Sequence, residues 1–219
     1  MIDIESLRSE MCRVGRSLFE RGYVHATAGN ISARLPQDGG FLITPTDACL
    51  GFLEPDQLAH VGADGVQLSG ARASKTLALH RRIYASDLQA HSVIHTHSTH
   101  LVALTLAGVS SEADVVPPIT PYFVMKVGHV PLIPYHRPGD PATAERVAKA
   151  IAQAQARGVP IRAVMLDRLG PNVWHESPAA AMATLEELEE TARLCLMTRP
   201  QPLSESQIDE LRTHFGAHW

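Results

Sequence analysis

The chain has 219 residues, 45% of them hydrophobic and 19% charged, and its formal net charge is -4 at pH 7. This balance, without runs of like charge, lacks the electrostatic footprint of a nucleic-acid or membrane-surface binder, so small molecules and other copies of the chain are the expected partners. The length suits one sizeable core, and we predict a single domain over residues 1–219.

Hydrophobic periodicity in the first half predicts an opening helix followed by antiparallel strands. Leu7, Met11 and Leu18 fall on one helical face, and Gly22 stands where a C-terminal cap belongs. Alternating segments separated by small polar turns indicate hairpins, and Ser74 is the predicted N-cap of the next helix. The predicted elements are a helix over 4–21, a strand within 27–35, a turn over 37–40, strands over 41–44, 58–61 and 66–68, and a helix over 74–85.

The second half alternates apolar segments with proline-rich or polar turns. Three prolines between Pro117 and Tyr122 predict extended backbone there, and the acidic face of the long helix near the C-terminus is expected to meet solvent or another subunit. The predicted elements are a helix or strand over 101–106, strands over 130–135, 163–166 and 172–175, a turn over 167–171, and helices over 141–157, 178–197 and 204–215.

The cysteines and the N-terminal segment indicate the cellular compartment in which the protein is expected. Cys12, Cys49 and Cys195 follow no zinc-site spacing, and a secreted disulfide scaffold would carry an even and denser set. The first twenty residues are charged throughout, unlike a signal peptide, and no run reaches the roughly 18 apolar residues of a membrane span. We therefore expect a cytoplasmic protein without a membrane segment.

Four histidines lie within ten residues, at His91, His95, His97 and His100. If residues 92–96 form a strand, His95 and His97 share a face and can bind one metal ion, with His91 and His100 in outer-shell or substrate-facing positions. The alternative is a set of buried histidines satisfied by backbone groups, which is the commoner reading for a lone histidine. Two histidines at strand spacing favour the metal.

Three small-polar segments are candidate anion sites. The Gly29-Asn30 turn and the turn after Pro45 can present backbone N–H groups, although most such turns bind no ligand, and the helix that starts near Ser74 adds further open amides. The loop over 136–140 carries functional-looking side chains, and a solvated loop explains it equally well.

Several motifs, in this order along the chain, resemble the class II aldolase and adducin head-domain family. Within the family the chain is most similar to the 3-oxo-tetronate 4-phosphate decarboxylases, through residues 49–51, 130–132 and 137–140. The motifs shared with the family are Thr27-Ala28-Gly29-Asn30-Ile31-Ser32, Ile43-Thr44-Pro45-Thr46, Ser74-Lys75 with His80 behind it, Val93-Ile94-His95-Thr96-His97, Thr120-Pro121-Tyr122 and residues 185–192.

The resemblance implies a three-layer α/β/α sandwich around a mainly antiparallel sheet, and a cyclic homotetramer with active sites between subunits. It also implies a divalent ion, zinc, manganese or iron, held by three histidines of which His95 and His97 are two. Tyr122 is similar to the tyrosine that acts as acid from the neighbouring subunit. The residues that match the substrate and anion set, or stand within it, are Gly29, Asn30, Thr46, Asp47, Ser74, Lys75 and Thr76.

Three positions depart from the family pattern. Thr76 stands where the family has its catalytic glutamate, and a threonine hydroxyl cannot exchange a proton near neutral pH. Leu169 stands in place of the third histidine ligand, before Gly170. Asp47 replaces the glycine after Thr-Pro-Thr and brings a negative charge that opposes a phosphate.

The first functional hypothesis is a metal-dependent C–C lyase, an aldolase or decarboxylase, that acts on a small keto acid or sugar-acid derivative through a stabilised enediolate. His136 is a further candidate catalytic residue, and one of His100, His136 or Asp167 would complete a three-ligand site. Two histidines and one carboxylate would suit a non-haem Fe(II) oxygenase, which is the second hypothesis. The third is a non-catalytic assembly module like the adducin head.

Overall fold

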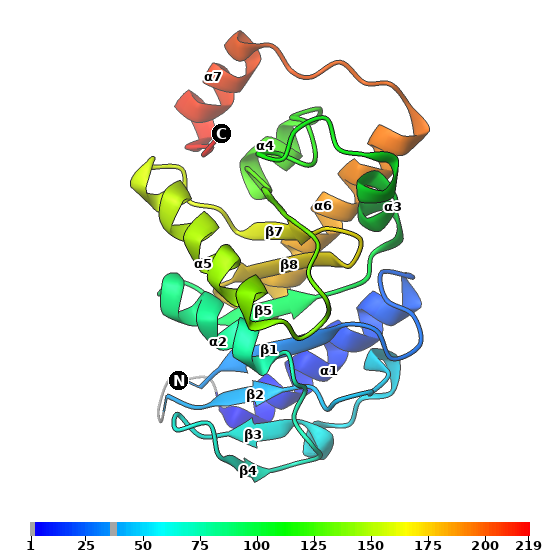
Figure 1. The fold of residues 1–219 in the computed structure, drawn as a ribbon, viewed down its shortest axis with the longest axis vertical. Coiled ribbons are helices and arrows are strands. Elements are labelled where there is room, and N and C mark those ends of the chain that lie inside the picture. Colours follow the sequence, from blue (N-terminus) through cyan, green and yellow to red (C-terminus); the bar gives the residue numbers. More distant parts are fainter. Residues whose placement is uncertain (1–2, 36–38) are drawn as a thin grey trace. The chain divides into compact units, whose positions relative to one another are not determined.

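A computed structural model describes residues 3–35 and 39–219 (Figure 1). Its internal contacts divide the chain into two compact units, the first made of Met1–His97 and Trp174–Met182, the second of Ser98–Val173 and Ala183–Trp219. The predicted turn over 37–40 lies partly outside the described residues. None of the described helices combines the length and apolar character needed to cross a bilayer.

Unit 1 contains five antiparallel strands in the spatial order β4-β3-β2-β1-β5. Both predicted hairpin pairings are confirmed, because β1 pairs with β2 and β3 with β4. The alternating pattern places Ile31, Leu42 and Ile94 in the core, each fully buried. The strands are β1 (Asn30–Arg34), β2 (Phe41–Ile43), β3 (Ala59–Val61), β4 (Gln67–Ser69) and β5 (Ser92–His95).

Helix α1 (Ile4–Glu20) is the predicted amphipathic opening helix. Its apolar stripe of Leu7, Met11 and Leu18 is buried, and the chain leaves the helix through Gly22 at φ 77°. Two short 3₁₀ turns, η1 (Leu50–Phe52) and η2 (Pro55–Gln57), pack against α1.

Helix α2 (Leu77–Ser86) begins three residues later than predicted, and Ser74 is not its N-cap. The backbone N–H of Ser74 donates to the Thr44 carbonyl at 3.2 Å, which commits Ser74 to a loop instead of a helix. The pairing of that loop with the segment around Thr44 therefore outweighs the capping propensity of serine.

Unit 2 contains β6 (Leu132–Ile133), β7 (Ala163–Leu166) and the greater part of β8 (Gly170–His175). β7 and β8 are antiparallel, as predicted for the two strands around the 167–171 turn, whereas β6 and β7 pair in parallel. The helices of this half are α3 (Thr99–Ala107), α4 (Pro121–Lys126), α5 (Pro141–Ala156), α6 (Pro178–Met197, which starts in unit 1) and α7 (Glu205–Phe215).

Two predictions in unit 2 were wrong. Tyr122 lies on helix α4 and not on extended backbone, because Pro121 occupies the first helical position, where no N–H is needed, and the Thr120 hydroxyl accepts the Phe123 N–H at 3.1 Å. Glu189 of α6 is buried, 2% exposed, and does not meet solvent, because its carboxylate accepts from the backbone N–H groups of His100 and Leu101 at the start of α3.

The strand pairs are mostly antiparallel and helices flank them, so the predicted α/β fold class is confirmed (Figure 1).

Candidate active site

The histidine pair is the centre of the candidate site in unit 1. β5 ends at His95, one residue earlier than the predicted strand, yet the rings of His95 and His97 still lie together, with centroids 5.0 Å apart and planes inclined by 69°. Val93 and Ile94 hold the strand in the core, His95 is 5% exposed, and His97 is half-buried. The structure thus brings the two predicted ligands to one place.

The electrostatics of His97 favour a neutral ring. Burial lowers the pKa of His97 because it disfavours the imidazolium, and a positive charge on His25 lowers it further. Neutral imidazole is the form that binds a metal ion, so no proton has to leave His97 near neutral pH before coordination.

The predicted Gly29-Asn30 turn lies directly beside this pair. Gly29 adopts φ 86°, and a Cβ placed on it would stand 2.8 Å from the His95 carbonyl oxygen and 3.1 Å from Val24 Cγ1. Only glycine fits such a close approach. The next residue, Asn30, opposes His95 in the antiparallel β1–β5 register, so the two side chains share a face of the sheet.

The two remaining anion segments, 44–47 and 72–76, pair with each other. The Thr46 N–H donates to the Arg72 carbonyl at 2.9 Å, and the Ser74 N–H donates to the Thr44 carbonyl at 3.2 Å. Thr44 is tied in turn to β1, since its hydroxyl accepts the Ile31 N–H at 3.2 Å. We call these two segments the loop pair, and β1 connects the loop pair to Asn30.

The loop pair differs from the expected cradle of backbone N–H groups. The amides of Thr46 and Ser74 are used in pairing, so the hydroxyls and the exposed Lys75 are the groups that remain to bind an anion. The Ser74 and Thr76 hydroxyls lie 2.8 Å apart, which places Thr76, at the glutamate position of the family, in contact with the loop.

Asp47 stands in a backbone conformation that glycine adopts easily. Its φ is 57°, in the left-handed region that Asp and Asn tolerate better than most residues. Its side chain is exposed. The turn is therefore compatible with glycine at this position, and the aspartate adds a negative charge to it.

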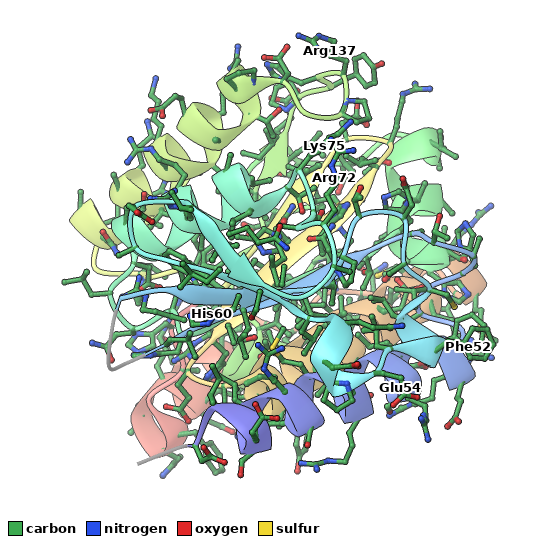
Figure 2. The ribbon with its side chains drawn as sticks, turned by 90° about the horizontal axis from the view of Figure 1, so that it is seen from below. Phe52, Glu54, His60, Arg72, Lys75 and Arg137 are labelled. Atoms are coloured by element: carbon green, nitrogen blue, oxygen red, sulfur yellow. The ribbon has the colours of Figure 1, made fainter. Side chains whose placement is uncertain are left out.

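Two side chains that the sequence interpretation did not select belong to this region. Arg72 is exposed and stands three residues before Lys75 on the segment between β4 and α2, where Figure 2 labels both cations. His80 of α2 is fully buried, and its Nδ1 lies 2.7 Å from Ser32 Oγ of β1. The sequence signals were a second cation next to the Ser-Lys motif and the place of His80 behind that motif.

Burial, together with the positive charge of a protonated His95, lowers the pKa of His80 to about 3. His80 is therefore neutral at physiological pH. Burial also raises the pKa of its neighbour Tyr84, whose hydroxyl lies 2.7 Å from Ser32 Oγ.

The remaining predicted site residues lie in unit 2. Tyr122 is 63% exposed on α4. Both ring nitrogens of His136 are engaged, because Nδ1–H donates to the Pro134 carbonyl at 2.6 Å and Nε2 accepts from Arg146 Nε at 3.2 Å. Metal binding or proton transfer by His136 would first have to break one of these bonds.

Asp167 and His100 have different surroundings. The Asp167 carboxylate lies 3.9 Å from Arg168 Nε, in the turn that carries Leu169. His100 Nδ1 lies 2.8 Å from the buried carboxylate of Glu189. A carboxylate behind one imidazole nitrogen orients the other nitrogen outward, as in many metal-ligating and proton-transferring histidines.

Within residues 3–35 and 39–219, no group of three or more His, Cys, Asp or Glu side chains is arranged to hold a metal ion. The His pair belongs to unit 1, whereas the four candidates for a further ligand or acid belong to unit 2. Completion of the site by any of them stays a prediction. Those candidates are His100, Tyr122, His136 and Asp167.

Comparison with known proteins identifies the family to which the chain is similar. Residues 9–196 match the family model described as the class II aldolase and adducin N-terminal domain. A 3-oxo-tetronate 4-phosphate decarboxylase of Cupriavidus necator is 56% identical over 97% of both chains. One from Escherichia coli K12 is 42% identical over 95% of this chain and 96% of its own.

A solved structure is similar to the chain over nearly its whole length. The crystal structure of YgbL from Escherichia coli, described as a putative aldolase/epimerase/decarboxylase, is 42% identical with a TM-score of 0.86, over 95% of this chain and 99% of that one. The family match covers most of the chain, and the relatives align over nearly its whole length. The chain therefore belongs to the class II aldolase and adducin N-terminal domain family.

Proposed function

We propose that this chain is a 3-oxo-tetronate 4-phosphate decarboxylase. The observation that carries the proposal is the assembly in unit 1 of the His95–His97 pair, the Gly29-Asn30 turn and the loop pair. The relatives at 56% and 42% identity bear this name, which confirms the predicted C–C lyase activity. Their names also favour a phosphorylated substrate, a point that Asp47 left open.

The reaction follows from the substrate's structure. The four-carbon acid has a carboxylate at C1, a hydroxyl at C2, a ketone at C3 and a phosphate ester at C4. The C1–C2 bond breaks, carbon dioxide leaves, and the electron pair forms a C2=C3 double bond with negative charge on the C3 oxygen. A proton then adds to C2, which gives a three-carbon hydroxyketone phosphate. Catalysis must stabilise that developing oxygen charge.

The residues present fit a divalent ion in part. His95 and His97 supply two imidazoles close together, and low basicity keeps His97 available as a ligand. Leu169 supplies no ligand, so metal affinity should be weaker than that of a three-histidine site. When bound, the ion would supply positive charge near the oxygen that becomes negative. Zinc, manganese and iron all suit imidazole ligands.

The loop pair is the proposed phosphate site. Lys75 provides a charge on the exposed loop before α2, and the Thr46 and Ser74 hydroxyls provide hydrogen bonds. Arg72 adds a second cation on the same segment, which offsets the negative charge of Asp47. The local balance of these three charged side chains is positive.

Thr76 favours decarboxylation over aldol cleavage. Retro-aldol cleavage starts with removal of a hydroxyl proton and therefore needs a base, which the family's glutamate would supply. Loss of carbon dioxide from a 3-oxo acid starts without a base, because the departing carboxylate is already ionised. A threonine in the glutamate position removes the first chemistry and leaves the second possible. The final protonation at C2 is assigned to Tyr122 of a neighbouring subunit, in a proposed homotetramer.

Release of carbon dioxide from 3-oxo-tetronate 4-phosphate tests the function. Purified protein should release one equivalent per substrate, with a three-carbon phosphate ester as product by ³¹P NMR. His97→Ala should abolish turnover and lower metal content, and His214→Ala, on α7, is the control histidine variant. Oxygen uptake by iron-loaded protein would support the oxygenase hypothesis instead, and no turnover with any metal would support an assembly module.

The three cysteines, Cys12, Cys49 and Cys195, are free thiols. Free thiols persist in reducing compartments, which supports the proposed cytoplasmic location.

A further inference from the structure

The helix that carries Tyr122, the proposed acid, is short. α4 has only six residues, Pro121–Lys126. Helices of fewer than about 12 residues are marginal by themselves, so packing against the rest of the protein must keep α4 ordered. α4 packs against α7, and the chain beyond α7 returns to α4 (Figure 1). The position of Tyr122 therefore depends on a segment that is remote from it in the sequence.

Phe123 anchors α4 on its inner side. This residue is fully buried, whereas its neighbour Tyr122 is 63% exposed. The Phe123 N–H donates to the Thr120 hydroxyl at 3.1 Å. The Phe123 carbonyl accepts from the N–H groups of Val127 at 2.9 Å and Gly128 at 3.1 Å. A shift of Phe123 would therefore move the backbone from which Tyr122 projects.

Trp219 is the residue of the chain beyond α7 that meets Phe123. The two rings are edge-to-face, with centroids 5.7 Å apart and planes inclined by 60°. The Trp219 ring also stacks on the ring of His129, at 4.3 Å between centroids and 21° between planes. Aromatic pairs in such geometries are favourable beyond the area that they bury. Trp219 thus joins Phe123 to the segment that follows α4.

Trp219 is itself held in place by polar contacts. Arg212 Nε donates to the backbone oxygen of Trp219 at 2.8 Å. Nδ1 of His129 lies 2.8 Å from both carboxylate oxygens of Asp114, and since a carboxylate only accepts, Nδ1 carries the proton. Asp114 also accepts the Val130 N–H at 3.2 Å. The carboxylate fixes the plane of the imidazole on which Trp219 stacks.

We propose that Trp219 is a positioning residue for the decarboxylation, which keeps Tyr122 where its hydroxyl can protonate C2. The inference rests on the proposed decarboxylase function and on Tyr122 as the acid. Proton transfer requires the donor within hydrogen-bond reach, and a displacement of about 1 Å can cost about 100-fold in rate. Trp219 acts through Phe123 and α4, and it needs no contact with the substrate.

A double-mutant cycle on carbon dioxide release tests the proposal. Trp219→Ala should lower kcat about three- to tenfold with little change in KM, because the acid acts in the chemical step. In protein that already carries Tyr122→Phe, the same change should lower kcat less than about 1.5-fold. An equal loss in both backgrounds would mean that Trp219 serves folding or assembly only, and it would overturn the proposal.

Three further variants complete the cycle. Trp219→Phe keeps an aromatic ring and should recover at least about half of the lost kcat. His129→Ala removes the stacking partner and should show the same dependence on Tyr122, so one poorly folding variant does not decide the result. Phe215→Ala is the matched control, because it removes a 65% exposed aromatic ring at the end of α7 and should keep the wild-type kcat.

A second readout needs no activity. The chain has four tyrosines, and ¹⁹F NMR of protein with 3-fluorotyrosine observes each, with Tyr122 assigned from Tyr122→Phe. Trp219→Ala should shift or split the Tyr122 resonance and leave those of Tyr23 and Tyr84, in unit 1, unchanged. An unchanged Tyr122 resonance would overturn the proposal.

The two assays also distinguish this inference from the proposed function. If wild-type protein releases carbon dioxide and Tyr122→Phe keeps the full kcat, the decarboxylase function stands and the role of Trp219 falls. If wild-type protein releases none, the decarboxylase function falls and takes the catalytic role of Trp219 with it, and the resonance still decides whether Trp219 holds Tyr122.

Discussion

His80 gives the protein a stability that depends on pH. Its folded-state pKa of about 3 lies well below the 6.5 of an ordinary histidine, because burial disfavours the imidazolium. The unfolded chain binds this proton as the pH falls below about 6.5, whereas the folded protein binds it only near pH 3. Folding stability is therefore complete above the unfolded pKa and declines as the pH falls toward the folded one.

The size of the effect follows from linkage. At pH 5, which is about 1.5 units below the unfolded pKa, His80 alone should lower the free energy of unfolding by about 2 kcal/mol relative to pH 7. The decline continues until about pH 3, where the folded state also takes up the proton. His97 contributes in the same direction, because burial lowers its pKa too.

A matched variant isolates the contribution of His80. His80→Gln keeps the size and a hydrogen-bonding end but does not titrate. Urea unfolding of metal-free protein at pH 7 and pH 5 should show a difference between the two pH values that is smaller by about 2 kcal/mol in His80→Gln than in wild type. An equal pH dependence in both proteins would mean that His80 is already protonated, or solvated, in the folded state. The inference that His80 is neutral in the folded protein would then be wrong.

Four further predictions concern single residues. Gly29→Ala should lower the free energy of unfolding by about 2 kcal/mol or more in urea titrations, because φ 86° and the His95 carbonyl at 2.8 Å exclude a Cβ. Glu189→Gln should cost about 2 kcal/mol by the same assay, since a buried carboxylate with three donors loses its charge; an unchanged midpoint would contradict this. Asp47→Gly should lower KM for the phosphorylated substrate roughly two- to fivefold, and Asp47→Asn should share the gain if charge is the cause. Tyr122→Phe should lower kcat at least tenfold with little change in KM, and light scattering should give four chains per particle; a fully active monomer would exclude the shared site.

Local pattern was sufficient for the regular elements. β7 and α6 have the predicted boundaries, and α1 ends one residue early, because each has a long apolar period or a clear stop signal. The sequence pattern was misleading where one residue type can either interrupt a helix or begin one. Pro121 was taken as a helix breaker and is a helix start, since the first turn needs no N–H from it.

Tertiary partners decided the other errors. The acidic face of α6 was expected to meet solvent or another subunit, yet its Glu189 accepts hydrogen bonds from the N-terminus of α3, 88 residues away along the chain. Ser74 was expected to cap α2, but its backbone N–H donates to the Thr44 carbonyl and holds Ser74 in the loop before the helix. Neither partner can be identified from the periodicity of one segment.

The candidate site shows the same contrast between features that follow from local sequence and features that depend on distant residues. The spacing of His95 and His97 was visible in the sequence, and their rings do lie together. The approach of Gly29 to His95 and the contact of His80 with Ser32 join β1 to β5 and α2, across 48 residues in the second case. Pairing over such distances is specified by the whole sheet, so the resemblance to a family could suggest these residues but the local sequence could not place them.

The departures from the family pattern become consistent when the required chemistry is considered. A decarboxylase needs phosphate binding, a way to stabilise charge on the ketone oxygen, and selection of the carbon that loses carbon dioxide, but no base to start the reaction. Thr76 removes a group that this reaction does not need. Asp47 keeps the left-handed turn beside Lys75.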